Sequence, residues 1–334
     1  MRWGIFDIGT RAVRLMLVDA SNAKRRRNES ELTHLGRYLT EDGLVEEGIA
    51  RLVQALGRCL EQSEGEPADQ YFAVATSALR EAKNRAHVLA RVHEELGLKL
   101  SVLSGEEEAY LSLLPVFYHF TQEISNGDPF LLIDQGGGST EISAGRFSGS
   151  IERLGGLSLP LGTERLKAAL LEEPEAPIQE SYRRVWREIE EVLETYQPNA
   201  LISAMTSTPI RRGFAMGSAI TRFTGHQSNR RQHGVSIGLS VMERYEEEVA
   251  SRYLNDTRPV SLLMEDTEQL DRDVLSIFGL PIYHRILQAH RLDALQICGY
   301  GLRYGVYYYL QARQRSPQLI QEIDLLMTPR NALK

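Results

Sequence analysis

One segment of the chain combines residue types that bind phosphate with residue types that bind a metal ion. It reads Asp134-Gln-Gly-Gly-Gly-Ser-Thr-Glu141 and directly follows an apolar run at residues 130–133, which predicts a buried strand. Consecutive glycines let backbone N–H groups surround phosphate oxygens without interference from side chains, and hydroxyl groups can donate further hydrogen bonds. Asp134 and Glu141 would repel a phosphate unless a divalent cation lay between them, so the segment predicts a Mg²⁺-assisted phosphate site. The residues expected to bind phosphate here are Gly136, Gly137, Gly138, Ser139 and Thr140.

The alternative for residues 134–141 is an ordinary glycine turn in a hairpin with two exposed acids. This alternative explains the three consecutive glycines and the two flanking carboxylates less well than a phosphate site does. A shorter copy of the arrangement opens the chain, where Asp7-Ile8-Gly9-Thr10 separates two apolar runs. Alone it would be an ordinary hairpin turn. Paired with the second copy, it predicts a second loop that grips a phosphate chain, with Asp7 acting on the metal through water and Gly9, Thr10 and Arg11 binding phosphate.

A third segment, Ala75-Thr-Ser-Ala-Leu-Arg80, follows a predicted strand and opens a predicted helix. A helix N-terminus favours anions, and Arg80 in its first turn could contact a phosphate with two hydrogen bonds. In the alternative, Thr76 or Ser77 only caps the helix and Arg80 is exposed. The residue types alone favour phosphate binding and helix capping equally.

A fourth segment, Ser104-Gly-Glu-Glu-Glu108, also has two explanations. Ser104 and Glu107 have the spacing of a capping box, in which each side chain accepts a hydrogen bond from the other residue's N–H. Glu107 could instead deprotonate an attacking water as a general base. From the residues alone, the capping box is the better-supported role.

Composition narrows the class of protein. The 334 residues predict about two domains at roughly 100–200 residues each, and 42% hydrophobic with 25% charged residues is typical of a globular chain. Cys59 and Cys298 are too few for a disulfide framework or a cysteine-rich zinc site. No apolar stretch approaches the roughly 18–20 residues of a membrane span, and Asp7 and Arg11 interrupt any signal-peptide core. We therefore expect a cytoplasmic protein with no membrane partner.

The net charge of −7 argues against a nucleic-acid partner. One segment is an exception, because residues 195–242 contain no aspartate or glutamate but several arginines. This local positive charge favours a polyanionic substrate, since clustered guanidinium groups would follow a phosphate chain. The residues proposed for such a substrate channel are Arg211, Arg212, Arg230 and Arg231.

Together these motifs resemble those of the exopolyphosphatase/guanosine pentaphosphate phosphohydrolase family (Ppx/GppA), within the superfamily of actin, heat-shock ATPases and sugar kinases. The resemblance covers most of the chain, and ATSALREAKN, SGEEEA and DQGGGSTE are its most specific parts. The matching segments are residues 7–10, 75–84, 104–109, 134–141, 158–162 and 301–305.

The resemblance implies an α/β fold of two actin-like (ribonuclease-H-like) domains, with mixed sheets flanked by helices and an active-site cleft between the domains. Domain I would comprise residues 1–126, completed by a C-terminal helix at about 303–334, and domain II residues 127–302. The implied reaction removes the terminal phosphate from inorganic polyphosphate or guanosine pentaphosphate (pppGpp) with Mg²⁺. Glu107 would orient or deprotonate the attacking water, although Glu106 and Glu108 flank it. Asp134 and Glu141 would hold the metal or position the water, and Arg80 would bind phosphate with the glycine loop.

The chain departs from the family pattern at three points. Thr10-Arg11-Ala12 stands where a Ser-Asn-Ser-like run is usual, so two small donors are missing while Arg11 adds a cation. The family's later glycine-rich loop corresponds to residues 204–208, which contain no glycine. No His-Asp motif is present, so the extra C-terminal domains of longer members are not expected.

Because of these departures, an alternative function is the regulatory binding of nucleotide or polyphosphate by a protein of the same fold with weakened catalysis. A sugar-kinase-like or ATPase function is disfavoured, because residues 75–84 and 104–109 resemble the phosphatase branch. The sequence does not choose between polyphosphate and pppGpp, and it leaves open whether the protein forms a homodimer.

Overall fold

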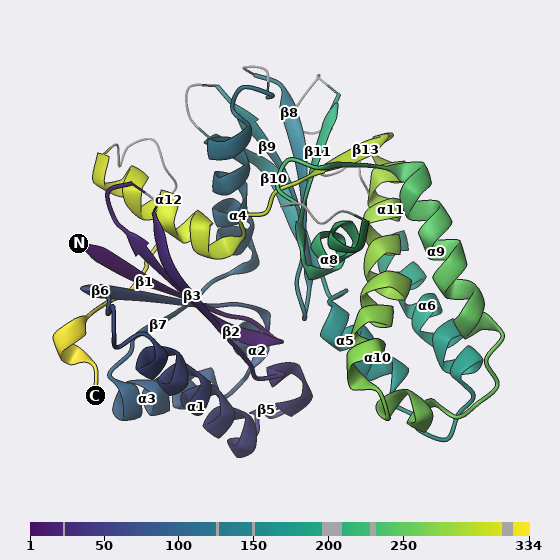
Figure 1. Ribbon diagram of the computed structural model, residues 1–334, viewed down its shortest axis with the longest axis horizontal. Coiled ribbons are helices and arrows are strands. Elements are labelled where there is room, and N and C mark those ends of the chain that lie inside the picture. Colours follow the sequence, from purple (N-terminus) through teal and green to yellow (C-terminus); the bar gives the residue numbers. More distant parts are fainter. Residues whose placement is uncertain (23, 125–126, 149–150, 196–208, 228–231, 316–322) are drawn as a thin grey trace. The chain divides into compact units, whose positions relative to one another are not determined.

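The computed structural model describes residues 1–22, 24–124, 127–148, 151–195, 209–227, 232–315 and 323–334. The chain divides into two compact units, of which unit 1 comprises Met1–Leu114 with Leu302–Lys334 and unit 2 comprises Pro115–Gly301 (Figure 1). The sequence placed the first boundary at residue 127, whereas the division falls inside helix α4 (Gly105–Phe120), which contains Pro115. Among the described residues, no helix is both long and apolar enough to cross a membrane.

Unit 1 is built on a mixed sheet with the strand order β14-β6-β1-β2-β3, and β7 also pairs with β6. The β1–β6 and β6–β7 pairs are parallel, while β1–β2, β2–β3 and β6–β14 are antiparallel. A separate small hairpin joins β4 and β5. The strands are β1 (Arg2–Ile8), β2 (Ala12–Asp19), β3 (Arg25–Leu32), β4 (Leu39–Thr40), β5 (Gly43–Leu44), β6 (Gln70–Ala75), β7 (Leu100–Val102) and β14 (Met327–Pro329).

Helices cover both faces of this sheet because its central strands, β1, β2 and β6, are runs of consecutive apolar residues that face both ways. Phe6 and Leu15 face a buried cluster that includes Leu52 of α1 (Glu46–Gln62) and Val88 of α3 (Arg85–Leu96). On the opposite face, the Trp3 ring packs edge-on against Tyr307 of α12 (Leu302–Arg315), with ring centroids 5.9 Å apart. The short helix α2 (Ser77–Glu81) follows β6.

Unit 2 has a second mixed sheet, with the order β10-β9-β8-β11-β13-β12. The β8–β11 and β11–β13 pairs are parallel, and the others are antiparallel. The strands are β8 (Pro129–Gln135), β9 (Thr140–Phe147), β10 (Ile151–Leu159), β11 (Arg212–Gly217), β12 (Ser236–Gly238) and β13 (Ala294–Ile297).

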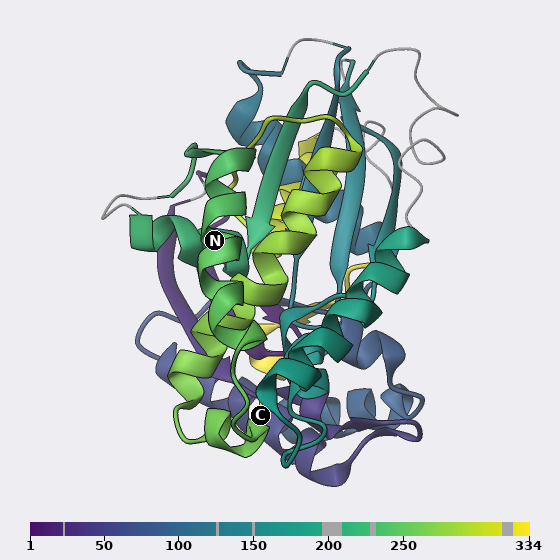
Figure 2. The same cartoon turned by 90° about the vertical axis from the view of Figure 1, so that its right-hand side faces the viewer.

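Apolar residues of β8 and β9 join the helices of unit 2 in one large core, and α6, α9 and α11 lie side by side (Figures 1 and 2). A π-helical turn, Leu275–Gly279, connects α10 to α11. On the other sheet face, Phe120 of α4 packs against Phe214, with ring centroids 4.9 Å apart. The two sheets flanked by helices confirm the predicted α/β class. The helices are α5 (Thr163–Leu170), α6 (Ile178–Glu194), α8 (Ser218–Gln227), α9 (Leu239–Leu254), α10 (Thr267–Val274) and α11 (Leu280–Ala289).

The part of the segment at residues 301–305 that belongs to unit 1 has a packing role. Gly305 lies on α12 directly against the backbone of Leu111 in α4, so closely that a Cβ atom would collide with the Leu111 carbonyl. A glycine at this point therefore lets α12 approach α4.

Gly305→Ala should lower the free energy of unfolding by about 1–3 kcal/mol, despite the better helix propensity of alanine, because packed backbone cannot yield to an added methyl group. Urea denaturation would measure the change. Gly301→Ala is the matched control, since a Cβ there meets no atom within 4 Å. Equal stability of the two variants would contradict the close packing of α12 on α4.

Candidate active site

Three of the sequence motifs in unit 1 follow three neighbouring parallel strands, β1, β6 and β7. The N–H of Thr76 donates to the carbonyl of Ile8 at 3.1 Å, and the N–H of Leu103 donates to the carbonyl of Ala75 at 2.9 Å. The turns that follow these strands therefore lie at one edge of the sheet. This is the carboxyl edge, where α/β sheets bind their ligands.

The first of these turns holds a buried hydroxyl group. The N–H of Gly9 donates to the carbonyl of Ala12 at 3.0 Å and closes the turn. Thr10 is buried, and its hydroxyl has no hydrogen-bond partner within the described part of the chain. Arg11 is half-buried, and its carbonyl accepts hydrogen bonds from the N–H groups that follow β3. A buried donor of this kind fits a loop that receives a ligand oxygen.

Asp7, at the start of the same turn, lies among arginines. It is directly opposite Arg14 in the β1–β2 pair, and its Oδ2 is 3.6 Å from the Arg14 Nη1. Burial lowers the pKa of Arg303, and the negative charge of Asp7 opposes that shift. The carboxylate of Asp7 is thus neutralised by cationic side chains of its own unit.

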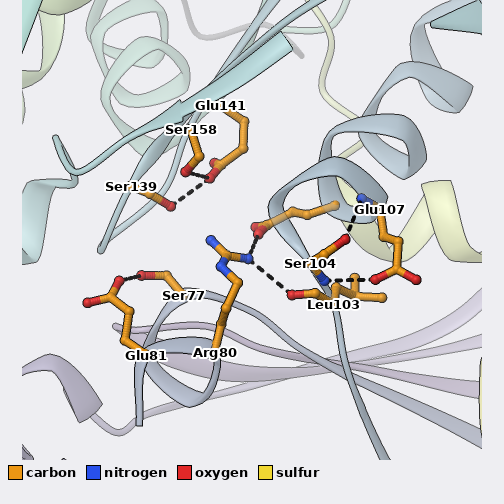
Figure 3. Close-up of polar contacts among 10 residues, drawn as sticks. Ser77, Arg80, Glu81, Leu103, Ser104, Glu107, Ser139, Glu141 and Ser158 are labelled. Atoms are coloured by element: carbon orange, nitrogen blue, oxygen red, sulfur yellow. Dashed lines mark hydrogen bonds and ion pairs between the residues drawn. The ribbon is translucent and has the colours of Figure 1, made fainter. Parts of the chain in front are cut away.

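Arg80 links the second motif to the fourth. Its Nη1 lies 2.6 Å from Oε2 of Glu108 and donates to the carbonyl of Leu103 at 3.3 Å (Figure 3). The alternative role of a capped helix with an exposed arginine does not hold, because Thr76 makes no side-chain cap and the Ser77 hydroxyl donates to Glu81. The guanidinium of Arg80 is therefore held in a set orientation at the sheet edge.

The capping box predicted at the start of α4 is present. The N–H of Ser104 donates to Oε2 of Glu107 at 2.7 Å, and the N–H of Glu107 donates to the Ser104 hydroxyl at 3.2 Å (Figure 3). No hydrogen bond to the other carboxylate oxygen of Glu107 occurs among the described residues. Glu106 is exposed and Glu108 is paired with Arg80, so Glu107 is the acid of this run that is both oriented and half-buried with one oxygen still open.

In unit 2, the first turn of α5 holds the carbonyl groups of the glycine loop. The N–H of Thr163 donates to the Gly136 carbonyl at 3.1 Å, and the N–H of Glu164 donates to the Gly137 carbonyl at 2.8 Å. In a trans peptide the N–H points opposite to the C=O, so the N–H groups of Gly137 and Gly138 are directed away from these donors. Across the described ranges, neither N–H makes a hydrogen bond. The loop therefore offers two neighbouring amide donors to an anion.

Hydroxyl groups beside the loop are used within the protein. Ser139 donates to Oε1 of Glu141 at 2.7 Å, and Thr140 donates to the carbonyl of Leu161 at 2.6 Å. The sequence assigned both hydroxyls to phosphate, but in this arrangement the available donors are backbone amides. Gly162 packs against the backbone of Gly137 and Gly138 so closely that a Cβ would collide with it.

The two acids that flank the loop form a cross-strand pair. Asp134 and Glu141 are directly opposite in the antiparallel β8–β9 register, so their side chains share one face of the sheet. Glu141 is 4% exposed, and its Oε1 also accepts a hydrogen bond from Ser158 at 2.9 Å (Figure 3). Burial raises the pKa of Cys298 to about 12, and the negative charge of Asp134 adds to that shift. The pair thus concentrates negative charge beside the loop amides.

This pair fits the donor set that Mg²⁺ takes on phosphate substrates, which is one or two carboxylates completed by water and phosphate oxygens. A fully protein-built cage is absent from the described residues, where no group of three or more His, Cys, Asp or Glu side chains could hold a metal.

A residue that sequence analysis did not select lies beside the loop. Gly217 ends β11 opposite Gln135, has φ +111°, and approaches the Gln135 carbonyl too closely for a Cβ. Helix α8 begins at the next residue, so its N-terminus lies at the same sheet edge as the glycine loop. The sequence placed the corresponding family loop at residues 204–208, which lie outside the described residues. An apolar run ending in Gly217-Ser218 was the available signal.

The two proposed channel arginines that the structure describes, Arg211 and Arg212, do not lie beside the glycine loop. Arg212 begins β11 opposite Phe130, at the other end of the strand from Gly217, and its Nη1 lies 3.9 Å from Glu123. Arg211 precedes it and is exposed. Arg230 and Arg231 lie outside the described residues.

Comparison with known proteins agrees with these motifs. The Ppx/GppA phosphatase family model matches residues 24–314. Exopolyphosphatase 1 of Mycobacterium tuberculosis is 27% identical over 322 residues, covering 92% of this chain and 87% of that protein. Exopolyphosphatase 1 of Mycobacterium leprae is 30% identical over 323 residues, covering 92% and 88%.

Solved structures share the fold. The Aquifex aeolicus member of the Ppx/GppA family matches with a TM-score of 0.69 and 23% identity, covering 94% of this chain and 99% of that one. An exopolyphosphatase-like protein matches with a TM-score of 0.73 and 19% identity, covering 94% and 100%. With its predicted motifs, its sheets and its relatives in agreement, the chain belongs to the Ppx/GppA phosphatase family of phosphohydrolases.

Proposed function

We propose that this protein is an exopolyphosphatase that releases the terminal phosphate of inorganic polyphosphate with the help of Mg²⁺. The observation that carries the proposal is the glycine loop, whose carbonyls are bonded to α5 while two amides remain for an anion beside the Asp134–Glu141 pair. The curated relatives named exopolyphosphatase 1 support polyphosphate as the substrate. Guanosine pentaphosphate ends in the same phosphoanhydride and is the second substrate to test.

The glycine loop would bind oxygens of the terminal phosphates through the amides of Gly137 and Gly138. Mg²⁺, held by Asp134 and Glu141, would neutralise charge that develops on the phosphate oxygens. The hydrogen bond from Ser158 fixes one oxygen of Glu141, which orients the carboxylate. Asp7 would act only through water, because Arg14 already neutralises it.

Glu107 would accept a proton from the water that attacks the terminal phosphorus, as the bond to the bridging oxygen breaks. Its Oε2 is oriented by the Ser104 N–H, which leaves the other oxygen for the water. Arg80, held by Glu108, and the buried hydroxyl of Thr10 would contact phosphate oxygens. Phosphoryl transfer depends mainly on positioning and charge neutralisation, so these groups suffice for hydrolysis.

Glu107→Gln should lower phosphate release from long-chain polyphosphate by about 100-fold or more, the usual contribution of a general base. Binding of tripolyphosphate should change little, because the amide keeps the size of the side chain and does not touch the loop amides. Release should be measured from polyphosphate, pppGpp and ATP, with Glu106→Gln as the control of equal charge change. Full activity in Glu107→Gln would remove it as the base, and release from pppGpp alone would replace polyphosphate as the substrate.

Asp134→Asn should raise the Mg²⁺ concentration needed for half-maximal activity by about tenfold, since one of two carboxylate ligands is lost. A Mg²⁺ titration of phosphate release measures the effect. Asp128→Asn, an exposed acid just before β8, is the matched control. If the two variants titrate alike, the metal is not held by Asp134.

A further inference from the structure

Three arginine side chains of unit 2 line a cavity of about 280 Å³. None of its lining residues belongs to the glycine loop. The walls come from α8, α9, α10 and the π-helical turn that follows α10. Side chains that line it include Arg222, Phe223, Tyr245, Arg252, Arg272 and Ser276.

The lining carries an excess of positive charge. Asp273 is the one acid among three arginines, and it already accepts hydrogen bonds from Tyr253 at 2.7 Å and from Gln269 at 2.7 Å. Within the described ranges, Arg222 and Arg252 make no hydrogen bond and no ion pair. Two guanidinium groups that lack carboxylate partners at one concave space favour an anion, and their planar donor array matches a phosphate group.

One wall of the cavity is aromatic. Phe223 is buried, and its ring centroid lies 4.8 Å from that of the half-buried Tyr245. Arg272 is held in place by Gln269, whose Oε1 accepts a hydrogen bond from Nη2 at 3.0 Å, and by Glu268, whose Oε2 lies 3.5 Å from Nη1. An apolar wall facing a few oriented charged groups is the usual composition of a small-molecule site.

The π-helical turn links this cavity to the glycine loop. Leu275 and Ser276, at its start, line the cavity, and Gly279 ends it. A Cβ built on Gly279 would lie 2.6 Å from Ala219 of α8 and 2.9 Å from Oε1 of Gln135, the residue that precedes the loop. Short π-helical segments inside helices occur frequently at functional sites.

We propose that this cavity is a second binding site for a phosphate-bearing anion, distinct from the glycine loop. Arg222 and Arg252 bind the phosphate oxygens, and Arg272 adds a third guanidinium. Two sources offer this chemistry, a segment of an inorganic polyphosphate chain or a free nucleotide whose base would lie against Phe223 and Tyr245. The proposal stands on the cavity itself and does not require the proposed hydrolysis.

Calorimetric titration with tripolyphosphate in the presence of Mg²⁺ tests the site, with the full chain carrying Glu107→Gln to prevent turnover. The double variant R222Q/R252Q removes the unpartnered arginines of the cavity. R187Q/R244Q is matched to it, because it removes the same charge from exposed positions of α6 and α9 that do not line the cavity. We expect two tripolyphosphate ions per chain in the parent and the control, and one in R222Q/R252Q, whose cavity affinity falls about tenfold or more.

One ion per chain in the parent and none in R222Q/R252Q would support the cavity but remove the glycine loop as a phosphate site. The same stoichiometry and affinity in R222Q/R252Q and in the control would overturn the proposal. Because Arg222 and Arg252 are exposed, we expect R222Q/R252Q to fold like the parent. The single variant R252E provides a second test by charge reversal. Guanylyl and adenylyl imidodiphosphate distinguish the sources: tighter binding than tripolyphosphate identifies a nucleotide, and equal or weaker binding identifies the phosphate chain.

Discussion

The chemistry of unit 2 depends on the hydrogen bonds by which the first turn of α5 holds the carbonyl groups of the glycine loop. Each peptide plane directs its N–H opposite to its C=O, so fixing the carbonyls of Gly136 and Gly137 on α5 also fixes where the next two amides point. Gly162 makes the approach of α5 possible, because any side chain there would push the loop away. The loop is therefore organised before a ligand arrives, which lowers the entropic cost of binding.

The two opening hairpins of the units resemble each other in position but differ in charge. In unit 1 the residue opposite Asp7 is Arg14, whereas in unit 2 the residue opposite Asp134 is Glu141. An acid opposite an arginine has its charge offset there, whereas two opposed carboxylates place a pair of cation ligands at one point of the sheet. This difference is the reason why we propose the metal at the carboxylate pair of unit 2 and not at Asp7. In both units the motifs follow parallel strands, whose carboxyl ends collect segments far apart in the sequence.

Local patterns predicted local structure well. The capping box of Ser104 and the strand before the glycine loop follow from spacing that a few neighbouring residues determine, whereas the α/β class was predicted from the resemblance to the family. Features set by tertiary contacts were not accessible in this way. Gly217 is selected by the backbone of β8, which lies more than 80 residues earlier in the chain. Likewise, an excess of arginine along the sequence does not say which end of a strand each one occupies, and Arg212 lies at the end away from the loop.

In the proposed function, the glycine-loop amides that α5 positions bind polyphosphate. The most direct test is the KM for phosphate release from long-chain polyphosphate in Gly162→Ala, with Gly238→Ala as the control, where a Cβ meets only an ordinary contact at 3.9 Å. Displacing the loop should raise KM about tenfold or more in Gly162→Ala, since two charge-assisted hydrogen bonds are weakened, and should leave the control unchanged. A folded Gly162→Ala protein with the KM of the parent would contradict the account.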